Sequence, residues 1–229
     1  MTRGWPRFSH YSRSDTLKIA IIGATGGSGR YFLELATSGG HEVKALARTV
    51  SKLDDWKGHI ELVQADGRDL DSLKNALDPD IDVVVNIVGA SNLSQARKVT
   101  DLYSVSTANL IAAMEHHGIK RLVSVSSSGV EPQENDNWFY VHILKRFFLQ
   151  PMYDDMLRME ALHAQSDLDY TLVRPPYLTK GAPTGEYRIS LNANFTDDKT
   201  LRRGDLAHFL LRACEDATAF SRAMVALSE

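Results

Sequence analysis

Three glycines at a spacing of three residues follow a short apolar segment near the start of the chain. Gly23, Gly26 and Gly29 come directly after residues 19–22, and the sequence beyond them is compatible with a helix. The first glycine permits a tight turn, the second lets the backbone approach phosphate oxygens, and the third lets helix and strand pack closely. Free N–H groups and the positive end of the helix dipole attract anions there. The turn predicts a site for the pyrophosphate of a dinucleotide. Further candidate contacts in it are Thr25, Gly27 and Ser28.

A cation stands where an NAD site usually carries an acid, at the end of the second expected strand. An Asp or Glu there would accept hydrogen bonds from the ribose 2′-hydroxyl. Arg48 occupies the position instead, with Ser51 close behind it, and a guanidinium binds phosphate through charge-assisted hydrogen bonds. We therefore expect NADP(H) as the cofactor. The alternative is that Arg48 is a solvated residue that stacks on adenine. Asp66, after the third strand, is either an adenine-side contact or a loop cap.

The sequence lacks the Tyr-x-x-x-Lys pair with which many reductases protonate a carbonyl oxygen. That spacing puts both side chains on one helical face, where lysine lowers the pKa of the tyrosine so that it acts as the acid. None of the eight tyrosines has a lysine four residues on, and Tyr140 has Lys145 five residues later. The expected hydride acceptor is therefore one that needs only weak acid assistance, such as a flavin or another planar conjugated molecule.

Two hydroxyl-bearing residues are the candidate catalytic groups. Ser127 closes the fifth expected strand, and Tyr177 follows a Pro-Pro break after the sixth. Either hydroxyl would orient the acceptor or relay a proton. In the alternative interpretation the serine caps strand-end backbone groups and the tyrosine is an aromatic wall without chemistry. Residues expected to border the cofactor at the same edge are Gly89, Ala90, Ser126 and Pro175.

Apolar segments of strand length alternate with amphipathic helical segments along the chain. The expected strands are residues 18–22, 42–48, 60–64, 82–88, 121–127 and 170–173. The expected helices include residues 69–77, 95–117, 152–165 and 205–215. This alternation of continuously apolar strands with helices predicts a single α/β domain, a doubly wound parallel sheet or Rossmann fold. Ligands of such sheets lie at the carboxyl ends of the strands, where all the candidate residues fall.

Composition excludes several classes of site and partner. The chain has 229 residues, 43% of them hydrophobic, and a net charge of -3, which gives no reason to expect nucleic acid or an anionic membrane. One cysteine excludes an internal disulfide and a cysteine metal cluster. No apolar run approaches the roughly 20 residues that span a bilayer. We expect a cytoplasmic monomer or weak homo-oligomer that binds a small-molecule substrate and no metal.

Two parts of the chain differ in composition. Residues 1–16 hold three arginines, several serines and no acid before Asp15, and they form a basic N-terminal extension without the apolar core of a secretory signal. Residues 17–229 form the expected nucleotide-binding domain, including a small C-terminal segment on the substrate side.

Several short runs of the chain are typical of one protein family. They are residues 22–26, 92–94, 109–114 with 117–118, 154–159, 175–176 and 205–212. On these runs the chain resembles the atypical short-chain dehydrogenases, the NmrA-like NAD(P)H-binding proteins, and above all the branch of biliverdin reductase B, an NADPH-dependent flavin reductase. The likeness covers residues 18–212. The runs Asp-Asp-Met-Leu-Arg-Met and Asp-Leu-Ala-His-Phe-Leu-Leu-Arg are the most specific.

The resemblance implies roles for the candidate residues, and the chain departs from it at three places. It implies that residues 23–29 bind the pyrophosphate and that Arg48 and Ser51 bind the 2′-phosphate. It also implies that Asp66 contacts the adenine and that Gly89 and Ala90 lie beside the nicotinamide half. Ser127 matches the active-site serine of the family. Tyr177 stands where the branch has an active-site histidine. The loop 129–149 is longer and carries Trp138, Phe139 and Tyr140, and the basic extension is added. These departures concern the substrate. Non-catalytic redox sensors and isomerases of the same superfamily stay as alternatives.

Overall fold

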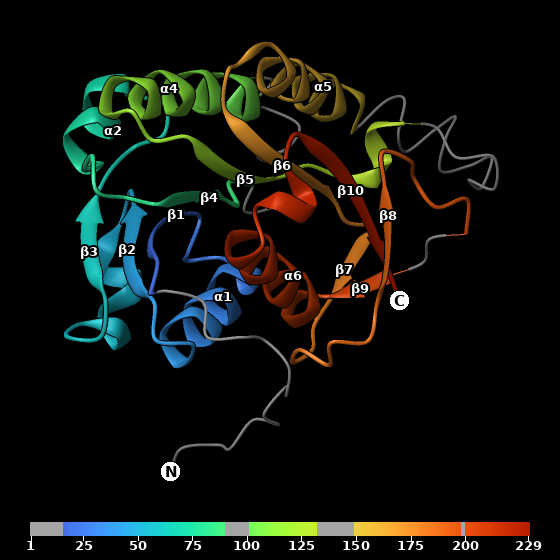
Figure 1. Ribbon diagram of the computed structural model, residues 1–229, viewed down its shortest axis with the longest axis horizontal. Coiled ribbons are helices and arrows are strands. Elements are labelled where there is room, and N and C mark those ends of the chain that lie inside the picture. The colour runs from blue at the N-terminus through green and yellow to red at the C-terminus, as the bar shows by residue number, and fades with distance from the viewer. Residues whose placement is uncertain (1–15, 90–100, 132–148, 198–199) are drawn as a thin grey trace.

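The computed structural model describes residues 16–89, 101–131, 149–197 and 200–229. Its centre is an eight-stranded sheet with the order β3-β2-β1-β4-β5-β6-β10-β8 (Figure 1). The strands are β1 (Lys18–Ile22), β2 (Glu42–Ala47), β3 (Glu61–Gln64), β4 (Val83–Asn86), β5 (Arg121–Val125), β6 (Asp169–Arg174), β8 (Arg188–Leu191) and β10 (Ala223–Ser228). Neighbouring strands are parallel except β8, which pairs antiparallel with β10. The predicted doubly wound α/β domain, a single Rossmann-like fold, is confirmed.

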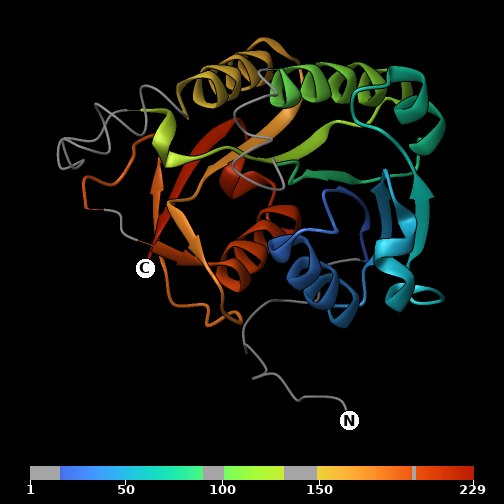
Figure 2. The same cartoon turned by 180° about the vertical axis from the view of Figure 1, so that it is seen from behind.

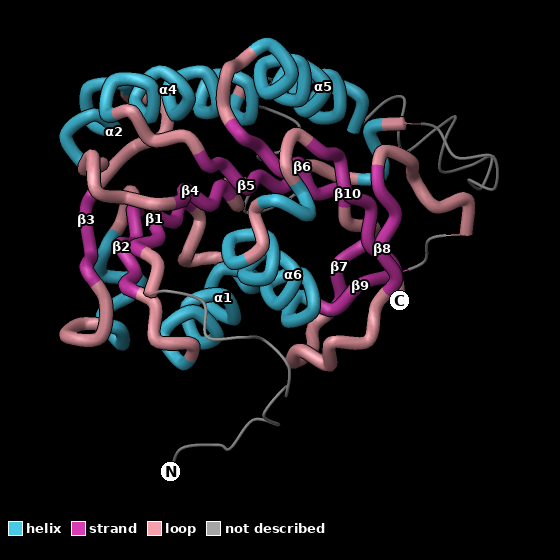
Figure 3. The backbone as a smooth tube through the Cα atoms, viewed as in Figure 1, coloured by secondary structure: helices cyan, strands magenta, loops and turns pink. Residues whose placement is uncertain are grey.

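Helices cover both faces of this sheet (Figures 1 and 3). One face carries α1 (Gly27–Ser38) and α6 (Arg203–Glu215), and the other carries α2 (Leu70–Ala76), α4 (Leu102–His117) and α5 (Gln150–Gln165). Short 3₁₀ turns η1 (Val50–Trp56), η2 (Ser128–Val130) and η4 (Thr218–Phe220) lie between these elements. A two-stranded sheet of β7 (Tyr177–Thr179) and β9 (Thr200–Arg202) lies beside the lower end of α6, as the view from behind also shows (Figure 2).

The core is split by the sheet into two apolar layers. Ile19 and Ile21 of β1 belong to the layer under α1 and α6, whereas Ala20 and Ile22 belong to the layer under α2 and α4. Successive side chains of a strand point to opposite faces, so a strand covered on both faces must be apolar throughout. This is why the central strands read as continuous apolar runs in the sequence.

Two of the family-specific runs each contain a buried aspartate that binds backbone N–H groups of a distant segment. Asp155 of α5 is fully buried and accepts hydrogen bonds from the backbone N–H groups of Tyr103 at 2.8 Å and Ser104 at 3.3 Å, at the N-terminus of α4. Asp205 of α6, also fully buried, accepts from the N–H groups of Thr184 at 2.6 Å and Gly185 at 2.8 Å. Each carboxylate therefore holds a segment distant in sequence against its own helix.

Three strands differ most from their predicted bounds, two of them shorter and one longer. β4 ends at Asn86 rather than 88, because the Asn86 side chain accepts a hydrogen bond from the N–H of Val88 and turns the backbone. β5 ends at Val125, two residues early, and β6 begins at Asp169 and ends at Arg174. The strands β7, β8 and β9 were not predicted, since each has only three or four residues and no clear alternation.

Some predicted features fall outside the described ranges, among them residues 1–15, Ala90 and the part of the long loop that holds Trp138, Phe139 and Tyr140. In the described ranges no helix combines the length and apolar character that crossing a bilayer requires. The same ranges hold no group of three or more metal-ligating side chains.

Candidate functional site

The glycine-rich turn joins β1 to α1 at the carboxyl edge of the sheet. Gly23 has φ +98°, and a Cβ there would overlap the carbonyl oxygen of Ile87 beyond β4. A Cβ on Gly29 would lie 2.5 Å from the carbonyl oxygen of Gly23 and 2.7 Å from Cα of Ala24. Two of the three glycines are thus required by the close contact of turn, helix and neighbouring strand. The backbone of Gly26 donates to Gly23 at 3.0 Å and closes the turn.

The N-terminus of α1 has the features of an anion site. Its cap residue, Gly26, offers no side-chain hydrogen bond, and its first turn contains no acid. Ser28 is only 3% exposed, and its buried hydroxyl has no hydrogen-bond partner among the described residues. A buried hydroxyl without a partner is costly, and an uncapped helix N-terminus carries free N–H groups and partial positive charge. Gly27 and Ser28 therefore fit the phosphate groups of a dinucleotide.

The residues predicted for the adenosine half lie at the ends of β2 and β3. Arg48 directly follows β2, is exposed, and makes no hydrogen bond or ion pair with the described residues. Ser51 lies in η1, which Arg30 of α1 holds in place through Asp55 and the carbonyl of Lys52, each at 2.6 Å. The free guanidinium of Arg48 therefore stands beside a segment fixed to α1.

Asp66 acts as a loop cap in this structure. Its Oδ1 accepts a hydrogen bond from the N–H of Arg68 at 3.0 Å, and its own N–H donates to the Ser72 hydroxyl at 3.1 Å. The side chain stays exposed at the end of β3. Of the two interpretations of Asp66, the loop-cap contact is present, and a contact to adenine stays a prediction.

Ser126 and Ser127 point to different partners although they are neighbours. The Ser126 hydroxyl donates to Oε1 of Glu160 on α5 at 2.6 Å, and Ser126 is 5% exposed. The Ser127 hydroxyl accepts from the N–H of Gly129 at 3.2 Å and so caps η2. A hydroxyl that accepts one hydrogen bond keeps its proton for another acceptor. Ser127, half-buried at the strand end, can therefore still donate, whereas the proton of Ser126 is committed to Glu160.

A buried ion pair lies directly behind these serines. Arg174, the last residue of β6, donates from Nε to Glu160 at 3.0 Å, and its Nη1 lies 2.7 Å from Glu131. Burial disfavours the charged guanidinium, but hydrogen bonds and charge from Glu160 and then Glu131 hold the pKa of Arg174 above its ordinary value. The cluster joins β5, β6 and α5 at the edge where the sequence placed the acceptor. Sequence reasoning did not identify Glu160.

Pro175 and Tyr177 continue this edge toward the small sheet. The carbonyl of Pro175 accepts a hydrogen bond from the N–H of Ser128 at 3.0 Å, which brings the two predicted strand ends together. Tyr177 begins β7 and is 77% exposed, so its ring and hydroxyl are open to solvent. Gly89, the last residue of the described range 16–89, is exposed. A Cβ added to it would lie 3.9 Å from the Tyr103 hydroxyl. The structure therefore places Ser127 and Tyr177 on neighbouring segments.

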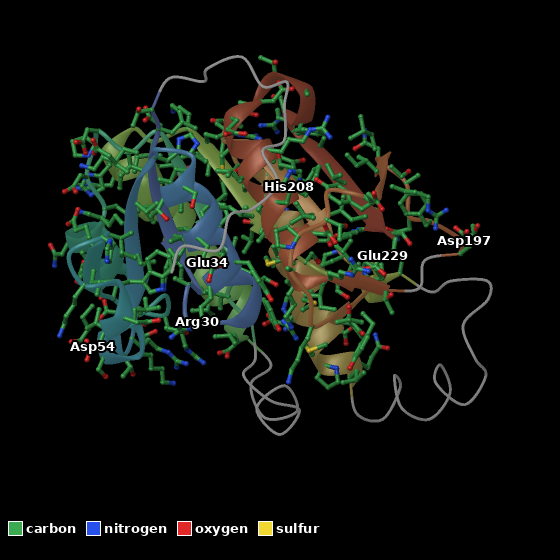
Figure 4. The ribbon with its side chains drawn as sticks, turned by 90° about the horizontal axis from the view of Figure 1, so that it is seen from below. Arg30, Glu34, Asp54, Asp197, His208 and Glu229 are labelled. Carbon is green, nitrogen blue, oxygen red and sulfur yellow. The ribbon has the colours of Figure 1, made fainter. Side chains whose placement is uncertain are left out.

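Arg203 is a candidate site residue that the sequence did not predict. It begins α6, and a Cβ added to Gly27 would lie 2.8 Å from Cδ and 3.3 Å from Nε of Arg203. The close packing of α1 and α6 brings the Arg203 side chain to the glycine-rich turn. Figure 4 shows the two helices from below, with Arg30 and Glu34 of α1 and His208 of α6 labelled. An arginine at the first position of a helix, where acids are favoured, was the signal in the sequence.

Comparison with protein families agrees with this geometry. A family model described as NAD(P)H-binding matches residues 23–217, from the first glycine of the turn to just beyond the end of α6. An uncharacterized chloroplastic protein of Arabidopsis thaliana is 28% identical over 205 residues, which are 86% of this chain and 69% of that protein. The photosystem II assembly factor Ycf39 of Synechocystis is 25% identical over 87% of this chain, which spans 59% of its length. The predicted NAD(P)H-binding relationship is confirmed, whereas a cytoplasmic location stays a prediction.

Solved structures share the fold over nearly the whole chain. ChuY, an anaerobillin reductase from Escherichia coli O157:H7, superposes with a TM-score of 0.71 and 24% identity, covering 93% of this chain and 97% of that one. A short-chain dehydrogenase/reductase from Veillonella parvula in complex with NADP has a TM-score of 0.74 and 16% identity, covering 93% and 94%. At these identities the likeness establishes the fold.

Proposed function

The chain belongs to the NAD(P)H-binding family, and on that premise we propose that it is an NADPH-dependent reductase of a planar conjugated acceptor such as a flavin or a linear tetrapyrrole. The observation that carries the proposal is the N-terminus of α1, which has no side-chain cap and holds the buried hydroxyl of Ser28, a group without a hydrogen-bond partner in the part of the chain that the structure describes. An anionic cofactor group would satisfy both features.

The choice of NADPH over NADH rests on Arg48. Its guanidinium is exposed at the end of β2 and has no partner among the described residues, so it is free to bind a 2′-phosphate. Ser51 of η1 would supply a neutral hydrogen bond to the same group. The acid that would favour a ribose 2′-hydroxyl is missing from this position.

The acceptor would lie at the carboxyl ends of β5 and β6. Reduced nicotinamide, when bound, supplies a hydride, and one proton completes the reduction of the acceptor. The Ser127 hydroxyl can donate toward this space because its Gly129 contact uses a lone pair and not the proton. Tyr177 offers an exposed ring for stacking and a hydroxyl open to water, from which it can be reprotonated. Ser126 would border the cofactor through its backbone.

A conjugated acceptor is favoured by the missing Tyr-x-x-x-Lys pair and by a structural neighbour that is an anaerobillin reductase. No tyrosine has a lysine four residues on, so carbonyl reduction with a Tyr-Lys pair as the acid is disfavoured. A conjugated acceptor spreads the incoming charge over its ring system and needs less acid assistance. The anaerobillin reductase with the same fold supports a conjugated substrate.

Anaerobic steady-state assays with NADPH and a panel of FMN, riboflavin and biliverdin test the proposal. We expect NADPH oxidation matched mole for mole by acceptor reduction. Ser127→Ala and Tyr177→Phe should each lower kcat, by about tenfold or more for a residue that relays the proton. Matched controls are Ser221→Ala and Tyr170→Phe, both at the opposite, amino edge of the sheet.

The outcomes separate the proposal from its two rivals. Tight NADPH binding without oxidation by any acceptor of the panel would contradict the reductase and favour a redox sensor. Conversion of a substrate without net loss of NADPH would favour an isomerase. Equal kcat in the Ser127→Ala and Ser221→Ala variants would remove the role of Ser127 and leave the reductase intact.

A further inference from the structure

Arg203 lies across the first turn of α1 although it belongs to α6. A Cβ on Gly27 would lie 2.8 Å from its Cδ, 3.3 Å from its Nε and 3.7 Å from its Nη1. The side chain of Arg203, from Cδ to Nη1, therefore lies against the backbone of Gly27, at the start of α1. Gly27, which has no side chain, leaves the room for it.

The guanidinium of Arg203 has no hydrogen bond or ion pair with any described residue, although the residue is partly buried. Its neighbours in sequence are engaged elsewhere. Arg202 lies 3.6 Å from Glu229, and the carboxylate of Asp205 is used by Thr184 and Gly185. Arg203 thus differs from Arg202 and Asp205 in that its side chain has no polar partner among the described residues.

The position favours a bound anion, because the acid in the first turn of α6, Asp205, already accepts hydrogen bonds from Thr184 and Gly185. Arg203 is the first residue of α6 and lies over the N-terminus of α1, so the positive ends of two helix dipoles meet a positive side chain. The next residue of α1, Ser28, adds a buried hydroxyl that no described residue satisfies. The guanidinium of Arg203, the N-terminus of α1 and the hydroxyl of Ser28 would all be satisfied by an anion.

We propose that Arg203 binds the pyrophosphate of the dinucleotide from the α6 side, opposite the backbone of the glycine-rich turn. This inference rests on the proposed cofactor binding and adds a residue to it. The pyrophosphate is common to both dinucleotides, so Arg203 contributes affinity for either one. Arg48 would then decide between them, and the two arginines would act on different phosphates.

Calorimetric titration of the full chain with cofactor fragments tests the assignment. ADP-ribose has the pyrophosphate but no 2′-phosphate. Adenosine 2′-monophosphate has the 2′-phosphate but no pyrophosphate. In Arg203→Gln we expect the Kd of ADP-ribose, NADH and NADPH to rise by about tenfold to 100-fold, the usual loss for a hydrogen bond to a charged group. The Kd of adenosine 2′-monophosphate should not change. Arg203→Lys should recover part of the affinity, since it keeps the charge without the planar fork.

Arg202→Gln is the matched control, because it removes the adjacent arginine of the same helix start. It should leave all the affinities unchanged. If Arg203→Gln and Arg202→Gln bind ADP-ribose equally well while the wild-type chain binds NADPH, the role of Arg203 is wrong and the proposed function stands. If the wild-type chain binds none of the probes, the cofactor proposal fails and the inference fails with it.

Discussion

The Ser126 hydroxyl donates a 2.6 Å hydrogen bond to Glu160, the carboxylate that also neutralises Arg174. The side chains of Glu160 and Arg174 are only 11% and 7% exposed. Three elements, β5, β6 and α5, are therefore tied together at the edge where the acceptor is proposed to bind. Ser127 follows directly, so the position of its hydroxyl depends on this buried cluster.

Glu160→Gln should destabilise the fold strongly. The change removes the charge that compensates the buried guanidinium of Arg174, and breaking a buried pair in this way costs about 3 kcal/mol or more. Glu131→Gln is the matched control, because Glu131 pairs with the same arginine but is 52% exposed. An exposed pair contributes at most about 1 kcal/mol. Urea unfolding of both variants measures the difference, and equal losses would show that Glu160 is not the main partner of Arg174.

Alanine at two glycines of α1 should lower stability at one position and not at the other. Alanine stabilises most helices by about 1 kcal/mol relative to glycine. At Gly29 the new Cβ meets backbone at 2.5 Å, so Gly29→Ala should instead cost about 2 kcal/mol or more. At Gly27 it meets only the flexible side chain of Arg203, so Gly27→Ala should not lower stability. Thermal unfolding compares the two, and a stable Gly29→Ala variant would contradict the close contact of turn and helix.

Arg48→Ala should weaken NADPH binding selectively. A lost charged contact to the 2′-phosphate corresponds to roughly 1.5–3 kcal/mol, or about tenfold to 100-fold in Kd, whereas NADH has no group there to lose. Fluorescence titration with both dinucleotides measures the ratio. Lys57→Ala, which removes an exposed cation from the end of the same segment, should leave both affinities unchanged. Equal losses for NADPH and NADH in Arg48→Ala would refute the assignment.

The sequence was sufficient for the parts of the fold that depend on local pattern. The continuous apolar strands and the glycine spacing can each be recognised within a few residues, and the order of the elements follows from the alternation of strands and helices. The role of Arg48 stays a prediction. Contacts between distant residues were not accessible in this way. The hydrogen bond from Ser126 to Glu160 joins residues 34 apart, and Arg203 meets Gly27 only because α1 and α6 pack side by side.

The family-specific runs identified the family, but the sequence did not show what their acidic residues do in the fold. The acids of residues 154–159 and 205–212 marked the family, yet the structure uses Asp155 and Asp205 as buried caps of distant backbone. A cap of this kind constrains residue type as strongly as a ligand contact does, so sequence alone did not distinguish the two. The short strands β7 to β9 escaped prediction because their pairing comes from tertiary packing.

His163 should make stability fall as the pH decreases. The ring is fully buried between α5 and β5, where Nδ1 lies 2.8 Å from the Met159 carbonyl and Nε2 2.8 Å from the Ser124 hydroxyl. A carbonyl only accepts, so Nδ1 carries the proton and Nε2 accepts from Ser124. Burial lowers the pKa of His163, an effect that the Met159 carbonyl and the charge of Glu160 only partly oppose. The neutral ring is therefore the folded form.

The sign of the pH dependence follows from this lowered pKa. Below the ordinary histidine pKa of about 6.5 the unfolded chain takes up a proton that folded His163 does not, so stability is lost by up to about 1.4 kcal/mol per pH unit. Above that pH His163 adds no dependence. Unfolding free energies at pH 7.5 and 5.5 should therefore differ more in the wild-type chain than in His163→Gln. His116→Gln, at an exposed position of α4, should keep the wild-type difference, and an unchanged difference in His163→Gln would show that its ring is protonated in the folded state.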